Sequence, residues 1–291
     1  MNLNLKGLAY IVIATLGFSI IPILASLGLS SNLSSATLLF YRFFIAFLFY
    51  LCFCLIKGKK ILLDNKKDYL FIIIGASIYS IQCVSFFSSF EHISSSLGEV
   101  IFHCYPLFIL ILAYIFLKEP ITKNKVMGVL LSIIGVAIVI YAPWNLMEIR
   151  GIIYVFIAAF ASAIYMVYSK RCIAQIDTIQ LTMYLSFFCA LFYFIFSAGS
   201  GEFEIIKEPN IIMNVLILAI FSTVIGFFSF MKAISLLKVG EVSILSLMEP
   251  IFTIILSFII LGTSLSVQQL VGTIILLLAI VIYEKSPKQR T

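Results

Sequence analysis

Four ionisable side chains stand well inside long apolar stretches of the sequence. They are Arg42, Glu99, His103 and Glu249. A charge near the centre of a bilayer costs about 2.5–3.5 kcal/mol on insertion scales, so such a side chain normally faces a water-filled cavity or a partner. We therefore expect these residues to contact a solute, carry a proton or pair with one another.

Glu99 and His103 are four residues apart, which places them on one face of a helix, and Ser95 and Ser96 continue this polar stripe. Histidine titrates near neutral pH and could relay a proton, or it could be an ordinary buried hydrogen-bonding group. Arg42 lies at a similar depth, so we expect it to pair with Glu99. Such a buried pair has a structural interpretation as well as a functional one.

Two prolines, Pro106 and Pro250, interrupt apolar stretches near their midpoints. Proline lacks an N–H, so we expect helix kinks there and free carbonyls four residues earlier, that of Ser246 among them. Tyr105 and Glu249 come directly before the two prolines. An aromatic hydroxyl at one site and a carboxylate at the other suit an asymmetric solute, and the carboxylate could also carry a proton.

The third apolar stretch carries Tyr79 and Gln82, which we expect to line the same cavity. The six cysteines form no CxxC pair, and the two histidines form no HExxH motif. The sequence therefore predicts no metal site and no other cofactor.

The 291 residues are 63% hydrophobic and only 11% charged, which excludes a water-soluble protein. Apolar runs of about 18 to 25 residues match the roughly 30 Å hydrocarbon core of a bilayer. We predict an all-α membrane protein with ten transmembrane helices, at residues 6–27, 34–56, 68–89, 95–116, 125–143, 150–169, 179–198, 211–232, 239–260 and 267–284.

The net charge of +6 follows from the placement of basic residues in the loops. If the N-terminus is inside, the outer loops hold only Arg150 and Lys207, and the inner loops and ends hold the other basic loop residues. This asymmetry predicts that both termini are cytoplasmic. We expect the protein to lie in a lipid bilayer, the bacterial cytoplasmic membrane. We expect it to bind no nucleic acid.

The chain repeats itself at a separation of 144 residues, most clearly at Pro106 and Pro250 and at Gly128 and Gly272. We predict a first repeat over residues 1–145 and a second over residues 146–291, each with five spans. An odd number of spans gives the second repeat the opposite orientation in the membrane. Inverted repeats are typical of transporters that work by alternating access.

Several motifs carry a family resemblance across nearly the whole chain. They are FEHISSSLGEVIFHCYPLF, LKEPIT and KVMGVLLSIIGVAIVI in the first half, and AISLLKVGEVSILSLMEPIF and VQQLVGTIILLLAIVIY in the second. The sequence resembles the EamA-type branch of the drug/metabolite transporter superfamily. The resemblance implies a fold and a transport class but no substrate, since members carry amino acids, nucleotide-linked metabolites or drugs. The family often has a Gly-Glu-Arg-like turn where this chain has Lys118-Glu119-Pro120 and Gly262-Thr263-Ser264.

We therefore predict a secondary transporter, an exporter of a small organic metabolite or drug-like solute. The chain has no GxxxxGK[ST] motif, so the energy would come from the gradient of the solute, of protons or of another ion. Two alternatives stay open: a passive channel, and an intramembrane enzyme that uses Glu99 and His103. The enzyme would lack an evident nucleophile or metal set.

Overall fold

The computed structural model describes residues 4–24, 33–93, 95–139, 148–172, 176–261 and 266–285. Throughout these residues the regular secondary structure is helical. Eight helical segments are long and apolar enough to cross a membrane, and Tyr105–Leu117 forms a shorter apolar helix. The predicted all-α membrane fold is thus confirmed, whereas the count of ten spans stays a prediction.

The helices follow the predicted spans. Two of those spans are each divided into two helices, and the span predicted at residues 211–232 consists of three consecutive helical segments. The first half contains α1 (Leu5–Phe18), α3 (Ser35–Ile56), α4 (Lys66–Ser89), α5 (Ser95–Phe102), α6 (Tyr105–Leu117) and α7 (Lys123–Val139). The second half contains α8 (Ile149–Cys172), α9 (Thr178–Gly199), α10 (Pro209–Ile217), the π-helix η2 (Leu218–Phe227), α11 (Phe228–Leu236), α12 (Val239–Leu245), α13 (Met248–Leu261) and α14 (Val267–Glu284).

Polar residues fix the starts of several helices. The side chain of Ser34 accepts a hydrogen bond from the N–H of Thr37 before α3, and that of Asp177 accepts one from Ile179 before α9. Each bond satisfies a backbone donor that has no partner within the helix. The long helices between these caps bury one side against their neighbours and leave apolar side chains exposed on the other, as a lipid-facing bundle requires.

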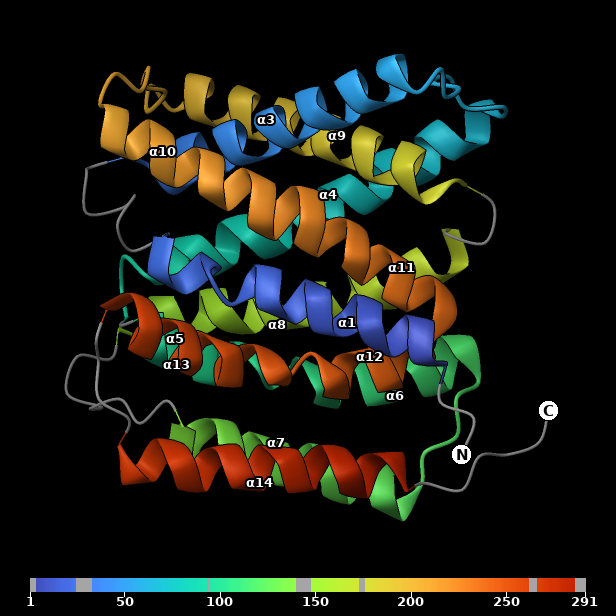
Figure 1. Ribbon diagram of the computed structural model, residues 1–291, viewed down its shortest axis with the longest axis vertical. Coiled ribbons are helices and arrows are strands. Elements are labelled where there is room, and N and C mark those ends of the chain that lie inside the picture. Colours follow the sequence, from blue (N-terminus) through green and yellow to red (C-terminus); the bar gives the residue numbers. More distant parts are fainter. Residues whose placement is uncertain are drawn as a thin grey trace.

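The helix packing has the symmetry that the 144-residue repeat predicts. The helix α7 packs against α14, and α3 packs against α9, so each of these pairs joins equivalent helices of the two halves (Figure 1). The contact of α4 with α8 in turn corresponds to the contact of α1 with η2 and α11. Exchanging the two halves therefore leaves the pattern of helix pairs unchanged, which is the relation expected of duplicated repeats.

Two equivalent glycines allow the same close approach in the two halves. A Cβ atom added to Gly7 in α1 would lie 2.7 Å from Leu237 Cγ, and one added to Gly151 in α8 would lie 2.8 Å from Ile93 Cγ2. Leu237 and Ile93 are themselves 144 residues apart. The start of the first helix in each half thus packs against the segment just before the divided helix of the other.

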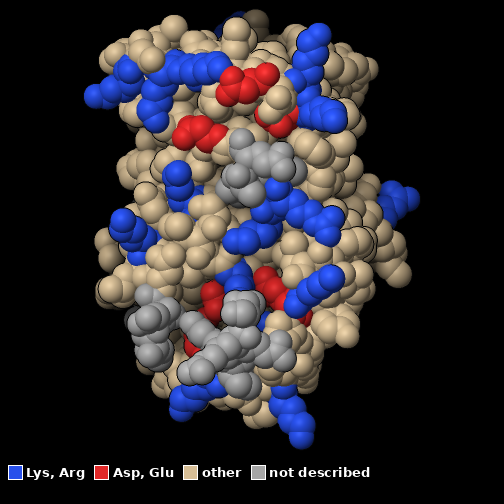
Figure 2. All heavy atoms as spheres, turned by 90° about the vertical axis from the view of Figure 1, so that its right-hand side faces the viewer, with Lys and Arg blue, Asp and Glu red and all other residues tan. Residues whose placement is uncertain are grey.

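The helix α1 begins and α14 ends on the same side of the bundle, at the right in Figure 1, and we call this side the terminal end. Viewed from this side, the molecule carries many Lys and Arg side chains and fewer acidic ones (Figure 2). Helix α3 begins and α4 finishes at the opposite end. The basic face agrees with the charge asymmetry of the sequence, and its cytoplasmic orientation remains a prediction.

Candidate functional site

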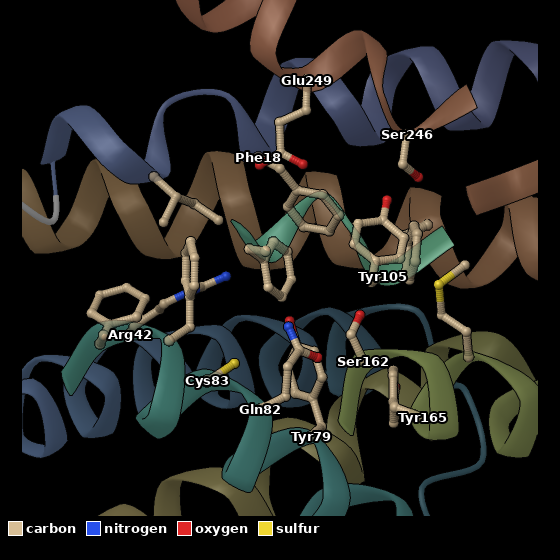
Figure 3. Close-up of a pocket in the computed structure, with 16 residues that line it drawn as sticks. Phe18, Arg42, Tyr79, Gln82, Cys83, Tyr105, Ser162, Tyr165, Ser246 and Glu249 are labelled. Atoms are coloured by element: carbon tan, nitrogen blue, oxygen red, sulfur yellow. The ribbon is translucent and has the colours of Figure 1, made fainter. Parts of the chain in front are cut away.

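A pocket with a volume of about 80 Å³ lies between the two halves (Figure 3). Five of the predicted site residues line it: Arg42, Tyr79, Gln82, Tyr105 and Glu249. The other lining residues are mostly aromatic or apolar; they are Phe18, Ile21, Cys83, Phe86, Phe87, Phe102, Ser162, Tyr165, Met166, Phe230 and Ser246. Such a mixture of apolar walls and a few polar groups is typical of small-molecule sites.

The pocket itself follows the repeat. Five pairs of lining residues are related by the 144-residue shift: Phe18 and Ser162, Ile21 and Tyr165, Phe86 and Phe230, Phe102 and Ser246, and Tyr105 and Glu249. Both halves therefore contribute matching positions to one site. The sequence analysis missed Phe18, Ile21, Ser162 and Phe230. A search for pairs of residues 144 positions apart, as Tyr105 and Glu249 are, could have found pairs of this kind.

Breaks in two helices bring Tyr105 and Glu249 to the pocket. The helix α5 ends at Phe102 and α6 begins at Tyr105, while α12 ends at Leu245 and α13 begins at Met248. Each break lies just before the proline predicted to kink the span. The carbonyl of Ser246 is not free as expected, because it accepts a hydrogen bond of 2.9 Å from the N–H of Glu249.

Arg42 is the largest fully buried side chain, with 1% of its surface exposed. Its Nε donates a hydrogen bond of 2.8 Å to Thr223 Oγ1, and its guanidinium carbon lies 5.1 Å from the centre of the Phe43 ring. Nη2 has no hydrogen-bond partner among the described residues. Because Arg42 lines the pocket, this unsatisfied donor favours an anionic group of a solute at this wall.

The expected ion pair between Arg42 and Glu99 is wrong. The described residues give Arg42 the hydroxyl of Thr223 instead, and Glu99 lies beside its helical neighbour His103, with 3.3 Å between Oε2 and Nδ1. An equal depth in the membrane does not fix which way a helix faces. A hydroxyl partner leaves the positive charge of Arg42 available to the pocket.

Glu99 and His103 form a buried pair that does not belong to the pocket lining. They are 8% and 1% exposed, and His103 Nδ1 also lies 2.8 Å from the backbone oxygen of Glu99. His103 Nε2 has no hydrogen-bond partner among the described residues. The side chains of Ser95 and Ser96, predicted to extend this stripe, lie outside the described set.

Glu249 reaches into the pocket from α13, and Tyr79 and Gln82 reach it from α4 on the facing wall (Figure 3). Its carboxylate has no hydrogen-bond or ion-pair partner within bonding distance in the part of the chain described. A partly buried carboxylate at such a wall can receive a cationic group or a proton. Glu249 and Arg42 thus give one pocket a carboxyl group and a guanidinium that make no direct contact with each other in the part of the chain described.

Aromatic rings in stacked and tilted contacts lie beside these two groups. The Tyr79 ring lies 4.8 Å from that of Phe227 and 4.7 Å from that of Tyr165. Tyr105 lies 5.3 Å from Phe102, and its hydroxyl donates a hydrogen bond of 3.4 Å to the carbonyl of Ser243 in the other half. These packed rings provide a rigid apolar surface on which the body of an organic solute can rest.

The pocket lies about midway between the two ends of the bundle. Its lining residues on α4 run from Tyr79 to Phe87, close to the end of this helix at Ser89. On α8, which runs the other way, the lining residues stop at Met166, before the last turn of the helix. The half of α4 nearest the terminal end and the half of α8 nearest the opposite end therefore take no part in the lining.

The comparisons with known proteins agree with this architecture. The profile of the EamA-like transporter family matches residues 5–141 and again residues 149–283. A protein from Archaeoglobus fulgidus described as an uncharacterized transporter is 30% identical over 230 residues, covering 78% of this chain and 81% of its own. The uncharacterized inner membrane transporter YicL of Salmonella typhimurium is 25% identical over 268 residues, covering 89% of this chain and 88% of its own.

A solved crystal structure has the same fold, with a TM-score of 0.73 and 17% identity, and the match covers 93% of this chain and 95% of that one. The two family matches fall on the two halves that share the pocket. The family matches confirm the resemblance to EamA-type transporters that the sequence motifs indicated. The chain is a membrane transporter and belongs to the EamA-like transporter family.

Proposed function

We propose that the protein is a secondary transporter that exports a small organic metabolite or drug-like solute by opening its pocket to each side of the membrane in turn. The observation that carries the proposal is the composition of the pocket, where five pairs of equivalent residues come from the two halves. Halves of opposite orientation around one site can exchange their conformations, and this exchange moves the site from one side to the other.

The solute we propose has an anionic group, a cationic or proton-accepting group, and an apolar body. The unsatisfied Nη2 of Arg42 supports the first, and the carboxylate of Glu249 supports the second. The rings of Tyr79, Phe102 and Tyr105 support the third. Because Arg42 and Glu249 have uncharged residues, Ser186 and Tyr105, at the equivalent positions of the other half, the solute would bind in one orientation.

The proposed setting is a bacterial cytoplasmic membrane, with both termini in the cytoplasm and net movement of the solute outward. A gradient would drive this movement, because the sequence has no phosphate-binding motif for ATP. Proton coupling through Glu249 is the form of coupling that the pocket supports best, since this carboxylate faces the solute space.

The experiment that tests the proposal first compares the metabolites released by cells with and without the protein. The released compound is then assayed in proteoliposomes for saturable uptake and for counterflow against unlabelled solute. We expect both. A solute flux that rises linearly with concentration and shows no counterflow would instead identify a passive channel, and unchanged metabolite release would contradict export.

A further inference from the structure

The carboxylate of Glu119 connects the two halves at the terminal end. Glu119 follows α6 in the first half, and its Oε1 accepts a hydrogen bond of 2.9 Å from the N–H of Val239 at the start of α12. Its Oε2 accepts a second, of 3.4 Å, from the N–H of Gly240. We call these two bonds the Glu119 contact. The N–H groups of Val239 and Gly240 lie in the first turn of α12 and have no partner within the helix. Because the Glu119 carboxylate that accepts their bonds is charged, it links the two halves strongly.

Local structure directs Glu119 toward α12. Lys118, which ends α6, has a φ of 57°, the only positive φ of a non-glycine residue in the described part of the chain. The N–H of Glu119 then returns to the carbonyl of Ala113 at 3.1 Å. A residue with a Cβ in this region is strained, so surrounding contacts must hold it there.

The Glu119 side chain is 11% exposed, and Lys125 Nζ lies 3.9 Å from its Oε2. A Cβ added to Gly240 would overlap the hydroxyl of Tyr283, so this side chain would have to move. A buried carboxylate, a nearby ammonium group and a close backbone approach therefore meet at one point between the halves.

The segment between α11 and α12 is also bound by a side chain of α8. Lys170 in α8 donates hydrogen bonds to the carbonyls of Ile234, at 2.6 Å, and Leu237, at 2.8 Å. These carbonyls lie at the end of α11, where the helix leaves acceptors without partners. A cation thus stabilises the end of α11, and an anion stabilises the start of α12.

The repeat makes the opposite end of the bundle a direct comparison. The residues 144 positions from Glu119, Lys125 and Lys170 are Thr263, Gln269 and Ser26, and all three are uncharged. The segment equivalent to residues 234–240 is residues 90–96, and it contains His92. The Nδ1 atom of His92 lies 2.8 Å from Glu148 Oε2 on the surface. The side chain of Glu148 is largely exposed, and an exposed pair of this kind contributes little stability.

We propose that the Glu119 contact keeps the terminal end closed beneath the pocket, and that it must break whenever the pocket opens at that end. This inference rests on the proposed alternating access. The halves are joined by largely buried charged groups at the terminal end, whereas the described counterpart of this region at the opposite end carries the more exposed pair of His92 and Glu148. Removing the carboxylate therefore shifts the protein toward the conformation that is open at the terminal end.

Cys83 provides a reporter, because it lines the pocket and is buried. The other five cysteines are replaced, and a small membrane-impermeant thiol reagent is added to either side of sealed vesicles; a C-terminal tag identifies the terminal end. We expect Glu119→Gln to raise the rate of Cys83 modification from the terminal end at least about tenfold, since bonds to charged groups contribute about 1.5–3 kcal/mol. Modification from the opposite end should fall.

Glu208→Gln is the matched control, because it makes the same chemical change at an exposed position before α10. It should leave both rates unchanged. If Glu119→Gln keeps the wild-type melting temperature but does not alter the ratio of the two rates, the inference is overturned. If Cys83 reacts equally from both sides in every variant, with and without solute, alternating access itself fails.

A measurement on the unmodified protein covers the case in which Glu119→Gln does not fold. Hydrogen exchange at the amides of Val239 and Gly240 should be slow in the absence of solute, and should speed up under transport conditions. Fast exchange at both amides without solute would overturn the inference, because it would mean that the Glu119 contact does not protect them.

Discussion

Arg42 in α3 and Thr223 in η2 share a hydrogen bond of 2.8 Å between Nε and Oγ1, although 181 positions separate them in the sequence. The bond uses one edge of the guanidinium. The other edge carries Nη2, which has no partner among the described residues and belongs to a side chain that lines the pocket. One side chain thus links the two halves and presents a positive charge to the solute space.

Replacing Arg42 should therefore affect binding more than folding. We expect Arg42→Gln to raise the KM for the exported solute at least about tenfold, because a hydrogen bond to a charged group contributes about 1.5–3 kcal/mol. Thr223→Val removes the hydroxyl that accepts the bond from Arg42 and that also lies 3.4 Å from Ser222 Oγ. It should lower the melting temperature while changing KM less. Initial rates in proteoliposomes and thermal unfolding separate the two effects, and an unchanged KM in Arg42→Gln would argue against anion binding there.

Glu249 should control the coupling of transport to a cation or a proton. Glu249→Gln keeps the size of the side chain and removes its charge and titration, so this variant should lose concentrative transport or its pH dependence. Glu249→Asp should keep part of both. Rates measured across a series of pH values decide this, and a well-folded Gln variant with an unchanged pH profile would make Glu249 a structural residue.

The close approach of α1 to η2 should be sensitive to a single methyl group. A Cβ on Gly17 would lie 2.5 Å from the carbonyl oxygen of Phe221 and 2.9 Å from Cα of Gly226, and backbone atoms cannot easily move away. We expect Gly17→Ala to destabilise the protein by about 1–3 kcal/mol, seen as a lower melting temperature in detergent. Gly199→Ala, where a Cβ meets nothing within 4 Å, is the control and should be neutral.

The orientation of the protein can be tested with tags at its two termini. The uneven distribution of lysine and arginine predicts that both are cytoplasmic. Tags at both termini should react with an impermeant label only after the cells are permeabilised. Labelling of a C-terminal tag in intact cells would show that the predicted topology is wrong.

The sequence was sufficient to predict the helices, because spans as apolar as Ser35–Ile56 and Thr178–Gly199 have no other stable state in a bilayer. It also predicted that the spans containing Pro106 and Pro250 are interrupted, with Tyr105 and Glu249 beside these prolines. The π-helix over Leu218–Phe227 was not predicted, since its residues read as one continuous apolar run. Its wider turns depend on contacts with α1 that no local pattern encodes.

The pocket was predicted in part for a similar reason. Polar residues such as Gln82 and Glu249 are conspicuous in an apolar sequence, and both line the pocket. Phe18 and Phe230 line it too, but a phenylalanine that faces lipid and one that faces a pocket look alike in sequence. The wrong pairing of Arg42 with Glu99 arose because depth along a helix can be read from sequence, whereas the rotation of the helix about its axis depends on packing.

The pair formed by α7 and α14 lies at one end of the long axis, and neither helix supplies a residue to the pocket lining (Figure 1). The two helices pack closely, with Gly128 against Tyr283 and Gly135 against Leu276. Cysteines introduced on their exposed outer faces, in place of Met127 or Leu278 for example, would accept thiol-reactive labels away from the pocket lining. Dyes attached there would mark a fixed frame of reference, against which single-molecule distance measurements could follow the movement of the other helices during each cycle.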